Sequence, residues 1–139
     1  MVAVEPPPPG ILPRQKLWLE RGDGGVVMSD YRLRLLEHVA ETGSLAQAAG
    51  LLELSYRRAW GKVRELEENL GYKVVESVVG GAGGGRTLLT PEGRALVAAY
   101  GRFQRRARQA VDAIFAEEVA PVLIAPRPDT ESARPGTLE

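Results

Sequence analysis

The segment Gly80–Thr87, which reads GGAGGGRT, has the spacing of a phosphate-binding loop. Such a loop requires Gly, four residues, Gly, Lys and then Ser or Thr, and it joins a strand to the N-terminus of a helix. Here Arg86 stands at the lysine position and lacks the compact ammonium group of lysine. The following residues, RTLLT, predict a strand instead of a helix, and no later strand ends in an Asp that could hold magnesium. We therefore interpret the glycine run as the tip of a β-hairpin and not as a nucleotide site.

A second group of residues whose side chains could bind a ligand lies just after Ser55. Between Ser55 and Arg64 the sequence has four basic residues and no acidic one, and acids return only at Glu65. Arginine matches the paired acceptors of guanine, and phosphates attract any cation. The alternative is a solvated basic face on an ordinary helix. The basic residues are Arg57, Arg58, Lys62 and Arg64.

Periodicity indicates that these basic residues share the outer side of a helix. At about 100° per residue, the predicted helix from Tyr56 to about Leu70 gathers its apolar residues on one side. Trp60 borders that stripe, whereas Arg57, Gly61 and Arg64 point away from it and Arg58 lies on the other flank. Gly61 has no side chain and would let the helix approach a duplex closely. The predicted buried stripe consists of Tyr56, Ala59, Val63, Leu66 and Leu70.

The elements around this helix predict a winged helix-turn-helix. Residues 16–28 read as a β-hairpin around the turn GDGG. A helix from Asp30 to Glu41 follows, with Ser29 as its N-cap and Gly43 as its end. Ser44 caps a short second helix, LAQAAGLL, and Ser55 caps the third, which Gly71 ends. Two strands, YKVVESVV and RTLL, then flank the glycine run and form the wing. A mobile loop without a ligand is the alternative for the wing tip.

A long helix is expected to begin at Pro91 and to continue to about Glu118. Its apolar residues are spaced 4, 3, 4, 3 and 4, which is typical of a dimerisation seam. Five arginines lie on its other side, where we expect a solvated face first and an additional phosphate contact second. The single histidine, His38, is interpreted as structural. The predicted dimer interface consists of Leu96, Tyr100, Phe103, Ala107, Ala110 and Ile114.

The composition fits one globular domain between two irregular ends. The chain has 139 residues, equal numbers of basic and acidic residues (18 each) and no cysteine, so zinc-finger, disulfide and thiol chemistry are excluded. We expect a flexible leader at 1–14, a DNA-binding domain at 15–90, the long helix at 91–120 and a disordered tail at 121–139. A cytoplasmic protein with no membrane segment is expected. One asparagine and an arginine-rich basic set are typical of thermophilic proteins.

These residues resemble the N-terminal DNA-binding domain of ModE-type molybdate-responsive regulators. The resemblance rests on the frame GS…AA…SY…AW in residues 43–60 and on the glycine-rich wing that leads to LTPEG. It covers about residues 15–120, and the same frame is more loosely similar to LysR-type regulators. It implies a homodimeric winged helix that binds a palindromic operator, with the long helix in the dimer interface. Ser55, Tyr56, Ala59 and Trp60 match the family pattern, and Arg57 stands where a basic residue is expected.

The resemblance also implies a difference from full-length ModE proteins. Those proteins carry C-terminal oxyanion-binding modules, whereas we expect a tail here, so no molybdate-binding residues are carried over. A constitutive regulator and a regulator that needs a separate sensor both remain open.

The fold we predict is mainly α with small β: a winged helix-turn-helix with a three-helix core, an N-terminal β-hairpin, a β-wing and a long C-terminal dimerisation helix. The predicted function is sequence-specific binding of double-stranded DNA in transcription regulation. A winged helix that contacts only proteins is the alternative. We expect no enzymatic activity, no metal and no other cofactor. The predicted DNA contacts are Ser44, Gln47, Ser55, Tyr56, Arg57, Arg58, Gly61, Lys62, Arg64, Gly81, Gly83, Gly84, Arg86 and Thr87.

Overall fold

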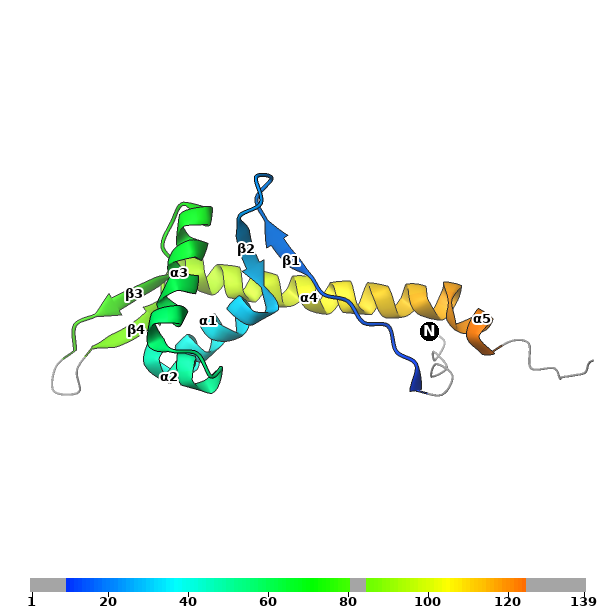
Figure 1. The fold of residues 1–139 in the computed structure, drawn as a ribbon, viewed down its shortest axis with the longest axis horizontal. Coiled ribbons are helices and arrows are strands. Elements are labelled where there is room, and N and C mark those ends of the chain that lie inside the picture. Colours follow the sequence, from blue (N-terminus) through cyan, green and yellow to red (C-terminus); the bar gives the residue numbers. More distant parts are fainter. Residues whose placement is uncertain (1–9, 81–84, 125–139) are drawn as a thin grey trace, which may run out of the picture. The chain divides into compact units, whose positions relative to one another are not determined.

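The computed structural model describes residues 10–80 and 85–124 of the chain. The chain divides into two compact units. One is Lys16–Gln104, and the other combines the terminal segments Met1–Gln15 and Arg105–Glu139. The first unit contains two small antiparallel sheets and three short helices, together with the first half of a long helix (Figure 1). This arrangement is the mainly α winged helix-turn-helix that the sequence predicts.

The predicted N-terminal hairpin is confirmed. Strand β1 (Trp18–Glu20) pairs antiparallel with β2 (Val26–Ser29), and the Arg21 N–H donates to the Gly25 carbonyl across the turn at 2.7 Å. Side chains from two helices hold the second strand. The Val26 carbonyl accepts a hydrogen bond from Arg32 Nη1 at 2.9 Å and another from Asn69 Nδ2 at 2.7 Å. The hairpin is therefore fixed to the helical core by polar contacts at its inner strand.

Three helices follow, and each begins at the serine that the sequence indicates. They are α1 (Asp30–Thr42), α2 (Leu45–Leu51) and α3 (Tyr56–Leu70). The hydroxyl oxygens of Ser29, Ser44 and Ser55 accept hydrogen bonds from the backbone N–H three residues later, which satisfies a donor that the helix itself leaves free. Gly43 and Gly71 end α1 and α3 with φ of 69° and 89°, a region that favours glycine.

The core lies between these helices and the base of the second sheet. Its largest fully buried side chains come from β2, all three helices and β3. Ala48 and Ala49 of α2 are also buried, and their small size lets α2 pack closely on its neighbours. Leu54, in the turn between α2 and α3, packs against the core as predicted. The fully buried large residues are Met28, Leu35, Leu36, Val39, Leu45, Val63, Leu66, Val74 and Val75.

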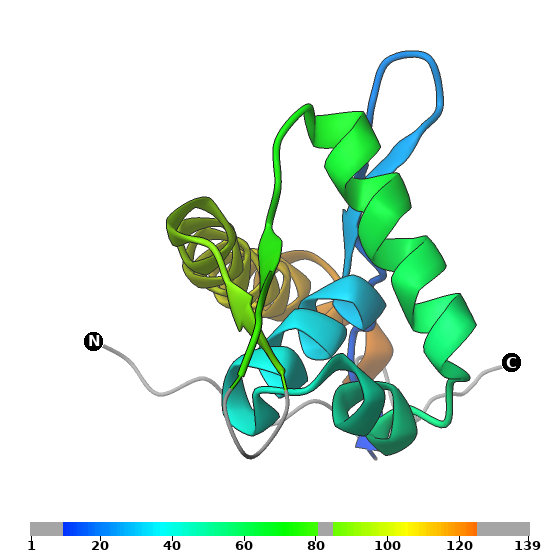
Figure 2. The same ribbon diagram turned by 90° about the vertical axis from the view of Figure 1, so that its left-hand side faces the viewer.

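The wing is an antiparallel pair of β3 (Val75–Val78) and β4 (Arg86–Leu89). Val75 lies opposite Leu89, and Val78 lies opposite Arg86. A strand therefore follows the glycine run, as the sequence predicts, and the strand–loop–helix order of a phosphate-binding loop is not present here. Figure 2 shows β3 descending from the C-terminal end of α3 beside the three-helix group.

Helix α4 (Pro91–Glu118) has the predicted bounds, and a short helix α5 (Ala120–Ile124) follows it. The prediction of a disordered tail from residue 121 is wrong for its first four residues, because the apolar sequence APVLI supports one further helical turn. The remaining tail, and residues 1–9 of the predicted leader, lie outside the described residues. Within the described residues, no helix combines the length and apolar character needed to cross a membrane.

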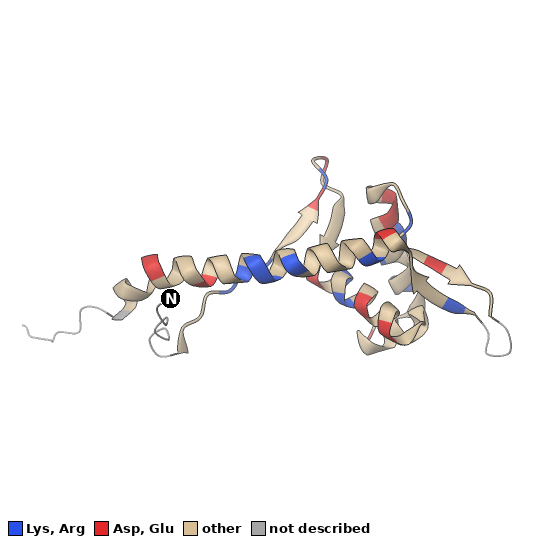
Figure 3. Ribbon diagram, turned by 180° about the vertical axis from the view of Figure 1, so that it is seen from behind, with Lys and Arg blue, Asp and Glu red and all other residues tan. Residues whose placement is uncertain are grey.

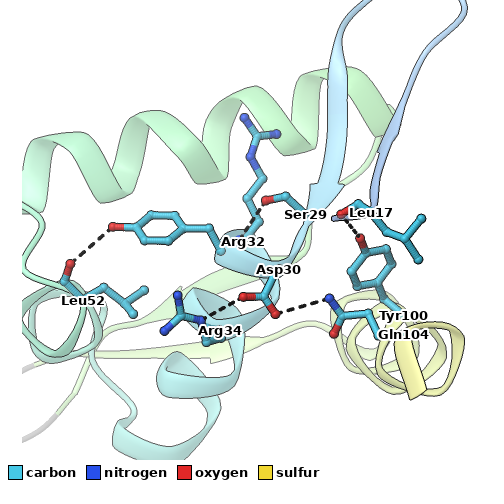
Figure 4. A network of polar contacts seen from close by, with 9 residues as sticks. Leu17, Ser29, Asp30, Arg32, Arg34, Leu52, Tyr100 and Gln104 are labelled. Atoms are coloured by element: carbon cyan, nitrogen blue, oxygen red, sulfur yellow. Dashed lines mark hydrogen bonds and ion pairs between the residues drawn. The ribbon is translucent and has the colours of Figure 1, made fainter. Parts of the chain in front are cut away.

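Polar contacts within the first unit link α4 to the start of α1 and to Leu17, the residue before β1 (Figure 4). Asp30 receives a hydrogen bond from Arg34 Nε at 3.2 Å and one from Gln104 Nε2 at 3.3 Å. The Tyr100 hydroxyl donates to the Leu17 carbonyl at 3.2 Å. Burial, and secondarily the negative charge of Asp30, raise the pKa of Tyr100, so this hydroxyl remains a donor. These contacts hold the part of α4 that belongs to the first unit against α1 and against the residue before β1.

Candidate nucleic-acid interface

The turn between α2 and α3 sets the direction of the third helix. Leu54 N–H donates to the Ala49 carbonyl at 2.9 Å, and Glu53 adopts a φ of 58°. Ser55 has extended backbone angles and accepts from the Arg58 N–H at 3.1 Å, so α3 begins immediately after it. Figure 2 shows α3 along the outside of the helical group, with α2 beside its N-terminal end. Among the described residues, none covers the outer side of α3, whose side chains are exposed.

The inner side of α3 confirms most of the predicted stripe. Ala59, Val63 and Leu66 are buried, and Trp60 and Leu70 pack partly against the core. Tyr56 is the exception, because its side chain is 54% exposed and not buried as predicted. Tyr56 occupies the first position of α3, and its hydroxyl oxygen accepts from Trp60 Nε1 at the surface of the helix.

The basic residues of α3 lie on its solvent side. Arg57, Arg58 and Arg64 are exposed, and none of the ion pairs within the described ranges involves them. Gly61 lies among them, and a Cβ added there would meet nothing within 4 Å. Lys62 is only half exposed, because its ammonium group lies 5.3 Å from the centre of the Tyr31 ring. The face that the sequence predicted to be cationic is therefore open, with Lys62 at its edge.

The other hydroxyl and amide groups of the predicted interface lie at the start of α2. Ser44 is half buried and its oxygen accepts from the Gln47 N–H at 3.0 Å, whereas the Gln47 side chain is exposed. Ser44 and Ser55 each keep a hydroxyl hydrogen that the cap does not use, since a hydroxyl can donate and accept at once. Both serines can therefore cap a helix and still donate to a phosphate.

The base of the wing is attached to the corner between α1 and α2. The Thr87 N–H donates to the Gly43 carbonyl at 2.9 Å. The Arg86 side chain lies close to the same glycine, since a Cβ added to Gly43 would be 3.7 Å from Arg86 Nε. Arg86 is exposed and Thr87 is half buried. The predicted contacts Gly81, Gly83 and Gly84 lie outside the described residues.

Two residues that support this interface, Glu67 and Thr90, were not predicted from the sequence. Glu67 is buried on the inner side of α3, where its Oε2 accepts from the Val74 N–H at 2.8 Å and the Val75 N–H at 3.2 Å. Thr90 accepts from the Gly93 N–H at 2.9 Å and donates to the Lys73 carbonyl at 2.9 Å. The spacing from Val63 to Glu67, one helical turn, was the available signal for a buried carboxylate. For Thr90, the available signal was a threonine directly before Pro91, the first residue of the helix, where an N-cap residue is expected.

The predicted dimer seam of α4 is only partly available. The prediction is wrong for Tyr100, which is 2% exposed in the core of the first unit, and Leu96 also packs against that core. The heptad spacing is present, but the apolar residues in its first half pack against the core of their own chain and are not available to a partner. Farther along α4, Phe103 is 43% exposed and Ile114 is 56% exposed, and Ala110 is exposed as well. Ala107 is half buried.

Two further groups that the sequence singled out are the arginines of α4 and His38. The arginines of α4 are all exposed and follow the helix in Figure 3, in agreement with a solvated face. His38 Nδ1 lies 3.1 Å from Glu41 Oε1, one turn along α1. Among residues 10–80 and 85–124, no cluster of three or more His, Cys, Asp or Glu side chains could hold a metal ion. The arginines in question are Arg94, Arg102, Arg105, Arg106 and Arg108.

Residues 31–94 match the family described as bacterial regulatory helix-turn-helix protein, lysR family. Among solved structures, the chain is similar to a crystal structure described as a BenM_DBD/benA site 1 DNA complex. That similarity has a TM-score of 0.50 at 22% identity and covers 71% of this chain and 100% of the other chain. At this identity the likeness establishes the fold.

The sequence relatives include proteins named ModE and MopB. The chain is 38% identical over 90 residues to the molybdenum transport protein ModE of Azotobacter vinelandii, a match that covers 65% of this chain and 33% of the relative. It is 32% identical over 91 residues to the DNA-binding transcriptional dual regulator ModE of Escherichia coli (strain K12), a match that covers 66% of this chain and 35% of the relative. It is 40% identical over 80 residues to the molybdenum-pterin-binding protein MopB of Rhodobacter capsulatus, covering 58% and 30%.

The chain thus spans about a third of the length of these curated relatives. Residues 31–94, which match the family model, contain the Ser44 and Ser55 caps, the exposed basic helix α3 and the strands β3 and β4. The fold is thus a winged helix-turn-helix, residues 31–94 match the helix-turn-helix of the lysR family, and part of this chain is similar in sequence to the ModE proteins.

Proposed function

We propose that this protein is a cytoplasmic, sequence-specific DNA-binding transcription regulator that acts as a homodimer. The observation that carries the proposal is the exposed cationic half of α3, which no other part of the described chain covers. Each protomer inserts the N-terminal half of α3 into a major groove, where the helix can bring side chains to base edges. Arg57 and Arg64 read guanine, and Gly61 allows close approach to the duplex.

The neighbouring groups hold the protein on the sugar–phosphate backbone. Ser44, Gln47 and Ser55 lie at the starts of α2 and α3, where free N–H groups and hydroxyls favour phosphate. Arg86 and Thr87 bring the wing to the flanking backbone. The hydrogen bond from the Thr87 N–H to the Gly43 carbonyl fixes the wing relative to the α1–α2 corner. The phosphate contacts of the wing and those of the helix starts are therefore made by one rigid surface.

Dimerisation uses the outer part of the α4 seam. Phe103, Ala107, Ala110 and Ile114 provide the apolar contact, because Leu96 and Tyr100 are engaged within the chain. Two-fold symmetry would place half-sites about 34 Å apart, or a multiple of this, on a palindromic operator. Sedimentation of the protein alone, compared with a variant carrying Phe103→Glu, tests this part of the proposal.

The proposal includes a role in the control of molybdenum-related genes. Its support is that several relatives carry molybdenum in their names. Selection of bound duplexes from a random pool, repeated with and without molybdate or tungstate, tests the operator, its symmetry and an effector response together. No retardation of random duplex DNA at micromolar protein and low salt would instead favour a protein-interaction module.

We expect Arg57→Ala to weaken binding to the selected operator by about 1–3 kcal/mol and to relax the base preference at one position, because arginine forms two bonds to guanine. Titration of the operator and of point variants of it measures both effects. Arg21→Ala, at the tip of the β1–β2 hairpin and paired with Asp23, is the control and should bind normally. If Arg57→Ala loses the same affinity for every DNA sequence, Arg57 contacts the sugar–phosphate backbone and not a base.

We also expect operator affinity to fall by about 10³-fold between 50 and 200 mM salt if the dimer neutralises six phosphates, because each contact releases condensed counterions. Equilibrium titration at four or five salt concentrations gives the slope of log K against log salt. A flat slope would show that the cationic face of α3 does not meet DNA.

A further inference from the structure

Tyr56 and Trp60 form a hydrogen-bonded pair on the surface of α3. Trp60 Nε1–H donates to the Tyr56 hydroxyl oxygen at 2.7 Å, and the two rings meet edge to face with their centres 6.5 Å apart at 87°. The Trp60 ring packs partly against the core, so one partner is held in place by the fold. The Tyr56 ring is 54% exposed. The hydroxyl is therefore fixed although it lies on the surface.

The chemistry of the two groups fixes the direction of the bond. An indole nitrogen can only donate, so the phenol oxygen must be the acceptor. The phenol keeps its own hydrogen, which points away from Trp60 and has no acceptor within the described residues. Hydrogen bonds in series polarise one another, so accepting from Trp60 strengthens the Tyr56 hydroxyl as a donor.

The surroundings of this free donor suit an anion. Arg57 and Arg58 follow Tyr56 directly, both are exposed, and no acidic residue occurs between Ser55 and Arg64. A base edge would demand a side chain that reaches into the groove, whereas Tyr56 occupies the first position of α3, beside the turn. A donor at this place meets the sugar–phosphate edge as the helix enters the groove.

We propose that Trp60 is a positioning residue that aims the Tyr56 hydroxyl at one DNA phosphate. The inference rests on the proposed function and adds to it a neutral contact that fixes how α3 is seated on the backbone. Because the donor carries no charge, the contact strengthens binding without releasing a counterion.

The test compares Tyr56→Phe, Trp60→Phe and the double variant on the selected operator. We expect Tyr56→Phe to bind about tenfold more weakly on every sequence, since a hydrogen bond to a charged group is lost. Trp60→Phe should bind about threefold more weakly, and the double variant no more weakly than Tyr56→Phe alone. The slope of log K against log salt should stay that of the unaltered protein. Additive losses in the double variant, or normal binding by Tyr56→Phe, would overturn the proposal.

A second measurement guards against a simple packing defect in Trp60→Phe. Single phosphates of the operator are replaced in turn by neutral methylphosphonates. At one position the unaltered protein should lose affinity about tenfold while Tyr56→Phe loses little, because its contact is already gone. If every position affects both proteins alike, Tyr56 touches no phosphate. If the unaltered protein fails to bind DNA at all, the proposed function fails first, and the two failures are distinguishable.

Discussion

Replacement of Gly93 by alanine is expected to destabilise the protein by at least about 2 kcal/mol, despite alanine being the better helix former. Gly93 is buried in the first turn of α4, and a Cβ there would lie 2.2 Å from the Val74 carbonyl oxygen and 3.0 Å from its carbon. Those atoms are backbone and cannot rotate away. The Val74 carbonyl also accepts the Thr90 N–H at 2.9 Å, so any shift of the strand breaks this bond.

The matched control is Gly61→Ala. Gly61 also lies within a helix, but a Cβ there meets nothing within 4 Å, so the substitution should stabilise the protein by about 0.5–1 kcal/mol. Urea unfolding followed by circular dichroism measures both variants. An equal effect of the two substitutions would mean that α4 does not approach the Val74 backbone as closely as described. Gly61→Ala should also weaken operator binding, because the added methyl group stands on the face of α3 that meets the duplex.

Replacement of Glu67 by alanine is expected to cost about 2–4 kcal/mol of folding free energy, because two buried backbone N–H groups would lose their acceptor. Glu67 Oε2 accepts from Val74 and Val75, whose residues are 0% and 1% exposed. The carboxylate therefore completes the hydrogen bonding of the chain where it passes from α3 into the wing. Lys73 Nζ, at 3.6 Å from Oε1, is the nearest cation and is largely exposed.

The control for Glu67 is its neighbour Glu68, which is exposed on the same turn of α3. Glu68→Ala should change the unfolding free energy by less than about 0.5 kcal/mol. Hydrogen exchange of the Val74 and Val75 amides should accelerate in Glu67→Ala and stay slow in Glu68→Ala. Slow exchange in both variants would show that another group satisfies these amides.

The positions of the helices could be predicted because their boundaries depend on neighbouring residues. Ser29, Ser44 and Ser55 cap the next residues in the chain, and Gly43 and Gly71 adopt a backbone conformation that other residues resist. Pro91 likewise marks the start of α4. These interactions span four residues or fewer, so a single sequence contains all the information they need. The exposed arginines of α3 followed from the same local periodicity.

What failed to be predicted depends on residues far apart in the sequence. Helical periodicity predicted that Tyr56 is buried. Its actual burial depends on how α2 and the turn before α3 pack near it, which periodicity does not contain. The seam of α4 could not reveal that Tyr100 meets the Leu17 carbonyl, 83 residues away. The clash at Gly93 exists only because the Val74 backbone, directly before β3, lies against the start of α4. The sequence by itself thus determined the helices, their caps and the cationic face, which arise from short-range hydrogen bonds and helical periodicity. Only the tertiary structure decided which apolar and polar side chains are buried, because burial is set by long-range packing.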